Sequence, residues 1–149
     1  MDTAVTMPGF RHHCAIQVRW GDMDALGHVN NAKFLTYMEQ GRLQYVNELN
    51  LWGGGRSKLG MILARVEIDF KLPLFASDDV HVFTRCVQFG RSSFKTEQWI
   101  ARRKDEQLEV AAQAILTIVV YDYEQQKSAP IPEGWRALVK AYEVAPLQE

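Results

Sequence analysis

The sequence is poor in features that would assign it to a specialised class of protein. Its 149 residues include only two cysteines, Cys14 and Cys86, which are far apart and lack the spacing of a zinc site. A chain of this length does not depend on a disulfide scaffold to fold. These observations exclude a disulfide-rich secreted module and favour reduced thiols, for which the cytoplasm is the expected compartment.

Long apolar runs and a surplus of charge are also missing. The longest apolar run surrounds Ile118–Tyr121 and is too short to cross a membrane, and Met1–Pro8 lacks the regions of a signal peptide. The formal net charge is −1, so no overall basic field favours nucleic acid or an anionic membrane surface. The sequence therefore predicts no nucleic-acid and no membrane partner, and any anionic ligand must meet a local cluster of charge.

The composition that remains is that of an ordinary globular protein. Hydrophobic residues make up 47% of the chain and charged residues 23%. The length fits one domain with a substantial core. We therefore expect a single domain over residues 1–149, with its core at about 12–125 and a short C-terminal helix at about 135–143.

Residues 31–48 have the clearest helical pattern in the chain. Apolar side chains recur there every three or four residues and predict one broad buried face. The residues of that face are Phe34, Leu35, Met38, Arg42, Tyr45, Val46 and Leu49. Asn30 or Asn31 is a suitable N-cap, and Gly53–Gly55 is expected to form a flexible connector after the helix.

Much of the remaining chain alternates between apolar and polar residues, as half-buried strands do. A first strand is predicted over His13–Trp20, and residues 61–70 alternate until Pro73 breaks the pattern. Three further strands are predicted at Asp79–Phe89, Ser92–Arg103 and Leu108–Tyr121. Because no strand–helix–strand unit recurs, a doubly wound parallel sheet is not expected. The order predicts an α+β fold in which a curved antiparallel β-sheet buries one long helix.

Polar groups gather in the loop before the predicted helix. Two carboxylates, one imidazole and two carboxamides lie close together, at Asp22, Asp24, His28, Asn30 and Asn31. The first turn of a helix has free N–H groups and the positive end of the helix dipole, so it stabilises nearby negative charge. An oxyanion formed during acyl transfer is such a charge, and an aspartate beside it can attack a carbonyl or take a proton from water. The loop therefore favours acyl transfer.

This segment carries a resemblance to a known family. The motif is Asp24-x-x-Gly27-His28-Val29-Asn30-Asn31-Ala32-x-Phe34, followed by Tyr37, Glu39 and Arg42. It resembles the acyl-CoA thioesterases of the 4-hydroxybenzoyl-CoA thioesterase type and is similar to the corresponding segment of plant acyl-ACP thioesterases. The resemblance continues through Asp69-Phe70 and Gly90–Phe94, and so covers roughly residues 12–125.

The resemblance implies a hotdog fold, in which one long central helix is wrapped by the curved sheet. It also implies a homodimer, or two dimers paired as a homotetramer, with active sites at the subunit interface. The implied activity is hydrolysis of an acyl-CoA or acyl-ACP thioester to a free carboxylic acid. No metal or redox cofactor is implied, because CoA is part of the substrate.

Roles for the catalytic residues follow from the same resemblance. Asp24 matches the catalytic carboxylate, which acts as nucleophile or general base, and the backbone amide of Asn31 matches the group that polarises the thioester carbonyl. His28 is expected to position water, although some bacterial relatives carry a histidine or tyrosine at the place of Asn31 instead. Glu39 is expected to orient the loop or hold a water molecule. Asp22 is interpreted as a structural residue of the loop.

A second group of residues is expected to bind the substrate and its CoA. It consists of Asn30, which also caps the helix, and of Arg91, Ser92, Ser93 and Lys95. Gly41 is interpreted as a point of close approach between helix and sheet, and Arg42 is expected to form an ion pair with Glu39.

Two other functions remain compatible with the sequence. The first is a hotdog dehydratase acting on a hydroxyacyl thioester, which needs a histidine–carboxylate pair directed at Cα and Cβ. The second is a non-catalytic acyl-CoA-binding protein. Separation of free acid from enoyl product distinguishes the first, and binding without release of thiol distinguishes the second.

Overall fold

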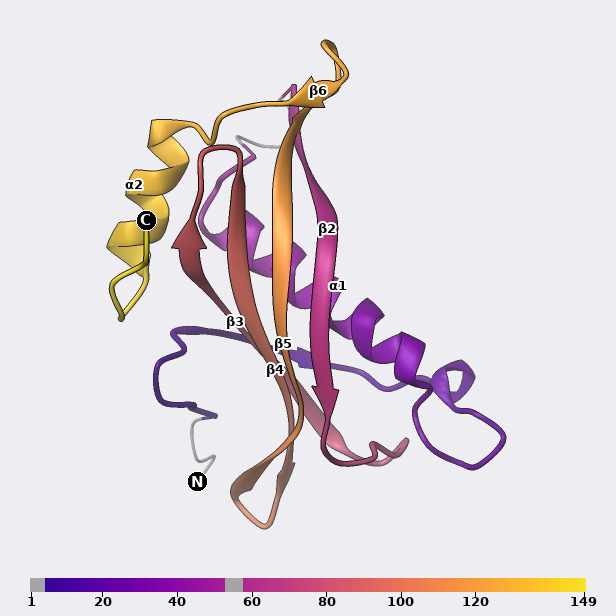
Figure 1. The fold of residues 1–149 in the computed structure, drawn as a ribbon. Helices are drawn as coiled ribbons and strands as arrows, with labels where there is room; N and C mark the ends of the chain where they lie inside the picture. The colour runs from indigo at the N-terminus through magenta and orange to yellow at the C-terminus, as the bar shows by residue number, and fades with distance from the viewer. Residues whose placement is uncertain (1–4, 53–57) are drawn as a thin grey trace.

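The computed structural model of the chain describes residues 5–52 and 58–149, so the connector expected at Gly53–Gly55 lies outside the described residues. An antiparallel sheet and two α-helices form the fold (Figure 1). In chain order the elements are β1 (His12–Ile16), the 3-10 helix η1 (Trp20–Asp22), α1 (Asn31–Glu48), β2 (Leu59–Phe70), β3 (Asp79–Phe89), β4 (Ser93–Lys104), β5 (Gln107–Asp122), β6 (Lys127–Ser128) and α2 (Glu133–Tyr142).

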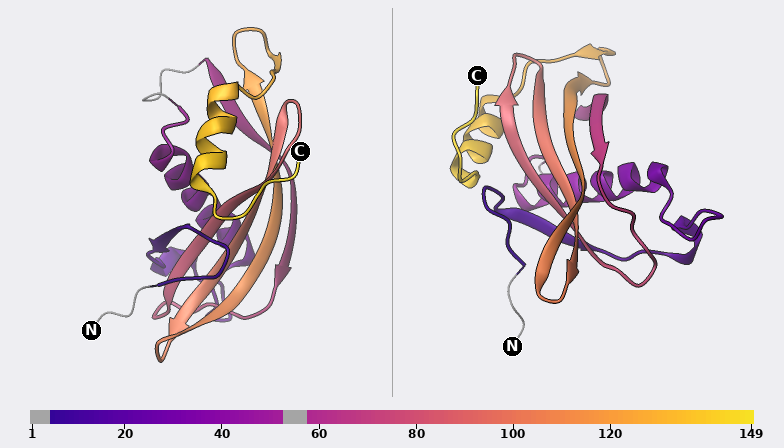
Figure 2. Two further views of the ribbon diagram at one scale, coloured as in Figure 1. Left: turned by 90° about the vertical axis from the view of Figure 1, so that its left-hand side faces the viewer. Right: turned by 60° about the horizontal axis from the view of Figure 1, so that its bottom comes forward.

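The strands form one sheet in the order β1-β3-β4-β5-β2, and β6 pairs with the end of β5. Every neighbouring pair is antiparallel, and the registers shift at bulges in β2, β3 and between β4 and β5. Such bulges increase the twist and bend the strands. Figure 2 shows the resulting curvature, with α1 and α2 on the same concave side of the sheet. The predicted curved antiparallel sheet is therefore confirmed.

Helix α1 packs against the concave face. Its bounds agree with the predicted residues 31–48, and the side chain of the N-cap Asn30 accepts a hydrogen bond of 2.9 Å from the Ala32 N–H. Its buried residues are Phe34, Tyr37, Met38, Gly41, Tyr45 and Val46. A Cβ atom at Gly41 would lie 2.6 Å from Val82 Cγ1, which confirms the predicted close approach of helix and sheet. The predicted burial of Leu35 is wrong, because this side chain is exposed.

Several predicted strand and helix ends need correction. The first strand ends at Ile16 and not at Trp20, because Asp22 folds back onto the Arg19 backbone N–H and closes the 3-10 turn η1. Helix α2 begins two residues earlier than predicted, since Pro132 is its N-cap and accepts from the Trp135 N–H. Strand β6 was not predicted, because two residues are too few to carry a pattern.

Strand β2 departs most from the expected half-buried pattern. Ile62, Ala64 and Phe70 are all exposed, although the alternation places them on the face toward the core. The reason is twofold: the register with β5 shifts between Leu63 and Arg65, and β2 is the edge strand of the sheet. Beneath α1 and α2 the main core is continuous, while Phe10 and Phe83 pack together on the opposite face.

Candidate active site

The side chain of Asp24 is partly fixed by its own loop. Its Oδ1 accepts hydrogen bonds from the N–H groups of Leu26, at 2.9 Å, and His28, at 3.1 Å. The Asp24 N–H in turn donates to the His28 carbonyl oxygen at 2.7 Å. No donor to Oδ2 occurs among the described residues. One carboxylate oxygen therefore holds the turn, as aspartates commonly do before helices, and the other is available to a ligand or to water.

Asp22, two residues earlier, is a structural residue of the loop. Its buried Oδ2 accepts from the Tyr37 hydroxyl at 2.6 Å and from the Arg19 N–H at 3.0 Å, and Lys33 Nζ lies 3.9 Å from Oδ1. Burial alone would raise its pKa, but these hydrogen bonds and the Lys33 charge outweigh burial and hold the pKa of Asp22 below its usual value. The Asp22 carbonyl oxygen also accepts from the Asn30 N–H, so the loop is tied to the start of α1.

The Asn31 amide lies in the first turn of α1. The N–H groups of Ala32 and Lys33 both donate to Asn30, through its side chain and its carbonyl oxygen respectively. The N–H of Asn31 has no acceptor within residues 5–52 and 58–149. Because it stands at the positive end of the helix, this group can donate to a developing negative charge. Asn30 is confirmed as the cap, and the use of the Asn31 amide in catalysis stays a prediction.

His28 is held by the same loop and by the connector between β2 and β3. Its backbone closes the turn with Asp24, and its ring meets Phe75 edge-on with ring centroids 5.3 Å apart. The next residue, Val29, donates its N–H to the Leu74 carbonyl oxygen at 2.8 Å. The loop is therefore well anchored, and the half-buried imidazole remains accessible to water.

Large apolar side chains stand unprotected around this loop. Trp20 is 88% exposed and Leu26 is 80% exposed, although each lies within four residues of Asp24. Exposed apolar side chains of this size, when they lie close together, can be covered by a ligand or another protein. Trp20 and Leu26 therefore leave apolar surface on both sides of Asp24 that a partner could contact.

Glu39 and Arg42 lie farther along α1, and the ion pair expected between them is absent from the described structure. Arg42 instead donates to Gln98 Oε1 at 3.1 Å, and Gln98 donates to the Met38 carbonyl oxygen at 2.8 Å. Burial of the Arg42 guanidinium lowers its pKa, which Glu39 partly opposes. The prediction was wrong because the sequence did not reveal a buried glutamine beneath the helix. Glu39 itself is exposed and lines a cavity described below.

Apart from Asn30, which caps α1, the predicted CoA-binding residues lie in or beside the turn between β3 and β4. The backbone of this turn is fixed, since Ser92 O accepts from the Val120 N–H and Arg91 O from the Ile131 N–H. The side chains of Arg91 and Lys95 are exposed and have no polar partner among the described residues. In Figures 1 and 2 this turn and the loop before α1 lie at opposite ends of the molecule. One chain therefore does not bring the two predicted groups of residues together.

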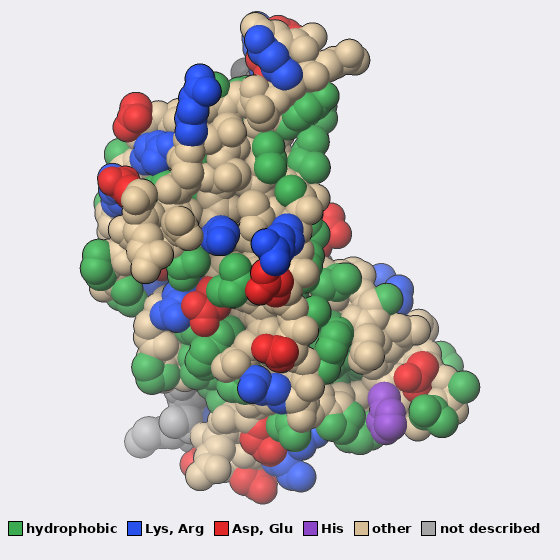
Figure 3. All heavy atoms as spheres, viewed as in Figure 1, with side chains coloured by type: hydrophobic (Ala, Val, Ile, Leu, Met, Phe, Trp, Pro, Cys, Tyr) green, Lys and Arg blue, Asp and Glu red, His purple; other side chains and the backbone are tan. Residues whose placement is uncertain are grey.

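The charge around these residues is mixed. Figure 3 shows lysine and arginine side chains scattered among acidic ones over the sheet face turned to the viewer, with hydrophobic side chains along the β2 edge. Among the described residues, no group of three His, Cys, Asp or Glu side chains could hold a metal ion. Neither described helix is both long and apolar enough to span a membrane.

A cavity of about 480 Å³ on the concave side of the sheet was not expected from the sequence. It lies among the second half of α1, strand β2, the middle of the sheet and α2. Helix α2 contributes Trp135 and Val139 to its wall. The i, i+4 spacing of these residues was the available signal, and it indicates that α2 buries one face.

Known proteins to which the chain is similar are described as thioesterases. Residues 18–139 match the family described as the thioesterase-like superfamily. A thioesterase from Thermus thermophilus, crystallised with coenzyme A and zinc, is 35% identical, with a TM-score of 0.80 over 94% of this chain and 100% of that chain.

Two further relatives carry more specific names. The long-chain acyl-CoA thioesterase FadM of Escherichia coli (strain K12) is 26% identical over 114 residues, which are 76% of this chain and 85% of FadM. A 1,4-dihydroxy-2-naphthoyl-CoA thioesterase from Synechocystis is similar in fold, with a TM-score of 0.71 at 22% identity, over 85% of this chain and 93% of that chain.

Proposed function

Since the chain belongs to the thioesterase-like superfamily, we propose that it hydrolyses an acyl-CoA thioester to a free carboxylic acid and CoA, with Asp24 as the catalytic carboxylate. The observation that carries the proposal is the pairing of a carboxylate oxygen without a partner among the described residues with the free Asn31 N–H at the start of α1. Hydrolysis of an acyl group requires a base or nucleophile and a donor that stabilises the oxyanion, and a carboxylate and a free amide at one helix start can supply them. The names of the relatives support acyl-CoA as the substrate class.

In the proposed reaction the Asn31 N–H donates to the thioester oxygen as it becomes negative. A donor of this kind is worth about 3 kcal/mol of barrier. As general base, Asp24 takes a proton from a water molecule whose oxygen attacks the carbonyl carbon. As nucleophile, Asp24 Oδ2 attacks the carbon itself and water then hydrolyses the mixed anhydride. In both routes the C–S bond breaks and the CoA sulfur accepts a proton.

The other predicted residues have supporting roles. His28 would orient the water, because its ring lies in the same loop and is partly accessible. Glu39, farther along α1, would orient the loop or hold a water molecule. The exposed cations Arg91 and Lys95, with Ser92 and Ser93, would meet the phosphates and pantetheine of CoA. The reaction as proposed uses no metal or redox cofactor, and CoA enters only as part of the substrate.

We further propose that the working unit is a homodimer joined along β2. This edge strand has 12 residues and exposes Ile62, Leu63 and Phe70, and a long apolar edge of this kind favours pairing with another strand. A two-fold axis through the middle of β2 would pair two copies antiparallel and reverse α1 as well. The start of one α1 would then approach the second half of the other, within a hotdog fold whose sheet wraps both helices.

The dimer accounts for the separation of the predicted residues. Asp24 and the β3–β4 turn lie at opposite ends of one chain, but a two-fold partner would place its turn near the first chain's loop. The covering of Trp20 and Leu26 by a partner or its substrate would follow from the same arrangement. A homotetramer remains a prediction of the resemblance. We also propose a cytoplasmic location, which the two buried free cysteines support.

The proposal is tested by thiol release from a panel of acyl-CoAs and acyl-ACPs. Wild-type protein should release thiol and free acid, and Asp24→Asn should lower kcat about 10²- to 10⁴-fold, the usual contribution of a positioned base. Asp105→Asn, an exposed aspartate in the β4–β5 turn, is the matched control and should be unaffected. An Asp24→Asn dimer with full turnover would remove Asp24 from the mechanism. An enoyl product, or binding without thiol release, would favour the dehydratase or the binding protein.

A further inference from the structure

The cavity on the concave side of the sheet has the size and lining of a ligand site. Its volume of about 480 Å³ falls within the range of about 300–1,000 Å³ that is usual for small-molecule pockets. Its walls are mainly aliphatic and aromatic, and among the described residues the only charged side chains that line it are Glu39 and Arg42 of α1. It is therefore suited to an apolar group with a polar end.

The exposure of the lining residues gives the cavity a direction. Glu39, Leu43 and Leu63 are exposed and mark its open side, between α1 and the β2 edge. Tyr45, Cys86 and Val139 are buried and mark its closed end, between α1, β3 and α2. A ligand would enter beside the proposed dimer interface and extend toward α2.

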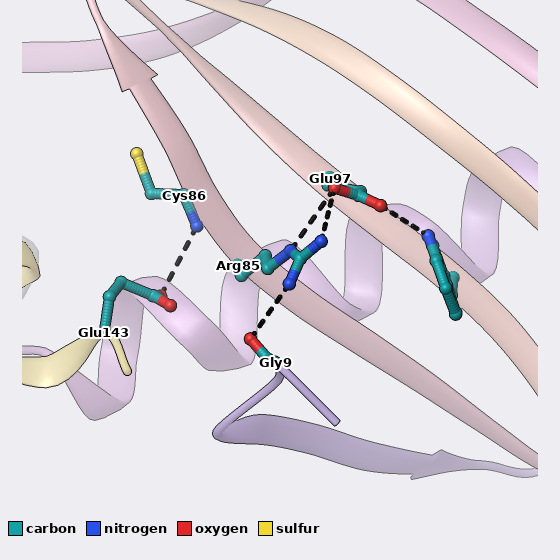
Figure 4. A network of polar contacts seen from close by, with 6 residues as sticks. Gly9, Arg85, Cys86, Glu97 and Glu143 are labelled. Atoms are coloured by element: carbon teal, nitrogen blue, oxygen red, sulfur yellow. Dashed lines mark hydrogen bonds and ion pairs between the residues drawn. The ribbon is translucent and has the colours of Figure 1, made fainter. Parts of the chain in front are cut away.

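Polar contacts fix the closed end in place. The Tyr45 hydroxyl donates to Glu143 Oε1 at 2.6 Å and joins α1 to the end of α2. The same oxygen accepts from the Cys86 N–H at 3.4 Å, and Figure 4 shows that the neighbouring Arg85 is directed instead to Glu97 and Gly9. Burial raises the pKa of the Cys86 thiol to about 12, so this side chain is neutral and apolar in character. The closed end is therefore a fixed wall.

Helix α2 is also secured at its other end. Arg136 donates to the Gly90 carbonyl oxygen, and its guanidinium lies 5.0 Å from the centroid of the Phe89 ring. Beyond α2, the backbone of Gln148 pairs with β3. Its N–H donates to the Val87 carbonyl oxygen, and its carbonyl oxygen accepts from the Phe89 N–H. Because both ends of α2 are attached to β3 or its turn, the wall formed by Val139 does not depend on a single contact.

We propose that this cavity holds the acyl chain of the thioester and that Val139, with Tyr45 and Cys86, sets the longest chain that fits. The inference rests on the proposed hydrolysis of acyl-CoA and adds the site of the acyl group and the residues that select its length. The thioester carbonyl would remain at the open side, where the partner's loop can approach it. The chain would extend inward and contact Val139 with its terminal methyl.

The test is a series of straight-chain acyl-CoAs of increasing length. For wild-type protein, kcat/KM should rise by about fourfold for each methylene that is buried, and fall once the chain exceeds the cavity. Val139→Phe should move the optimum to shorter chains, and Val139→Ala should move it to longer ones. If the phenylalanine variant does not fold, Val139→Ile replaces it in the test. This variant adds one methylene and should move the optimum to shorter chains by a smaller amount.

Leu138 provides the matched control, because it is on the same helix, is 46% exposed and does not line the cavity. Leu138→Phe and Leu138→Ala should leave the length profile unchanged. Identical profiles in wild-type protein and both Val139 variants would overturn the inference while leaving hydrolysis intact. If wild-type protein released no thiol from any substrate, the proposed function would fail. Affinities of the same acyl-CoAs for Asp24→Asn and Asp24→Asn/Val139→Phe proteins, measured by calorimetry, would then still test the cavity.

Discussion

The two ends of helix α1 use their polar groups in opposite ways. At its start, Asp24 and the Asn31 N–H each keep one hydrogen-bonding group without a partner among the described residues, beside exposed apolar side chains. At its end, Tyr45 is buried and its hydroxyl is bonded to Glu143, around a cavity with apolar walls. The polar groups at the first end are available to a substrate, whereas those at the second end hold the wall of the cavity in place.

The difference between the two ends is the basis for proposing a site composed of two chains. Glu39 is the first residue of α1 that lines the cavity, and it lies eight residues, or about 12 Å, along the helix from Asn31, so the groups proposed for chemistry stand apart from the cavity proposed for binding within one protomer. Antiparallel pairing of two copies would bring the open end of one beside the cavity of the other. The separation of the proposed catalytic groups from the proposed binding cavity along α1 is therefore an argument for a site composed of two chains.

Mixed dimers test this division with the largest expected effect. Asp24→Asn lacks the proposed base and Val139→Phe blocks the cavity, so each homodimer should be nearly inactive on a chain of the wild-type optimum length. Random mixing gives half heterodimers, each with one intact site, so about a quarter of wild-type activity should return. The measurement is thiol release after the two proteins are unfolded together and refolded at equal concentrations.

A control mixture shows whether the recovered activity needs the base at position 24. Mixing Asp24→Asn with Asp24→Asn/Val139→Phe supplies cavities but no base, and should restore nothing. If the first mixture also stays inactive while native mass spectrometry shows heterodimers, each active site uses its own chain's loop and cavity, and the composite arrangement is wrong.

The sequence predicted the parts of the fold that depend on local pattern. Helix α1 was placed at Asn31–Glu48 because its cap and its apolar spacing agree, and the end of β3 was placed at Phe89 because the Gly90-Arg91 turn follows it. The exposure of Ile62 and Phe70 could not be predicted, because it depends on the position of β2 at the sheet edge. Strand order is a long-range property that local patterns do not contain.

The candidate site divides in the same way. The gathering of Asp24, His28 and Asn31 was visible because these residues are close in sequence. The cavity was not, because α1 and α2 that form it are about 90 residues apart in the chain. The incorrect Glu39–Arg42 pair has the same origin, since the true partner, Gln98, comes from β4.

The two ends of α1 can also be compared by the effect of substitutions on the free energy of unfolding. Asp22 lies beside the start of the helix. Asp22→Asn removes the charge that accepts from Tyr37 and should cost about 1.5–3 kcal/mol at pH 7. Because its pKa is lowered by folding, the contribution is present above the usual carboxyl pKa of about 4 and is lost as the pH falls through the lower folded value. Urea unfolding at pH 7 and pH 3 should show the difference between the proteins shrinking in acid, and a constant difference would contradict this.

Glu143 at the closed end should show the opposite pH dependence. Burial raises its pKa above the usual value, against the lowering effects of its hydrogen bonds to Tyr45 and Cys86. Its contribution is therefore present below the usual pKa and is lost as the pH rises through the raised folded value. Glu143→Gln keeps an acceptor for Tyr45 and should be neutral or up to about 1 kcal/mol stabilising at pH 7, with no gain in acid. A loss of stability at pH 7 that persists in acid would show that the negative charge is needed there.

Thr96 offers the smallest and most discriminating effect, because its hydroxyl lines the cavity and is buried without a partner among the described residues. An unpaired buried hydroxyl costs free energy that an apolar group of the same shape does not. Thr96→Val should therefore leave the free energy of unfolding unchanged or raise it by up to about 1 kcal/mol. Thr84→Val is the matched control: Thr84 is equally buried on the adjacent strand, but its hydroxyl accepts from Gln98 at 2.9 Å, so its loss should cost about 1–3 kcal/mol. If the Thr96 variant also lost stability, a water molecule or a ligand would satisfy that hydroxyl, and the closed end would be less dry than its walls indicate.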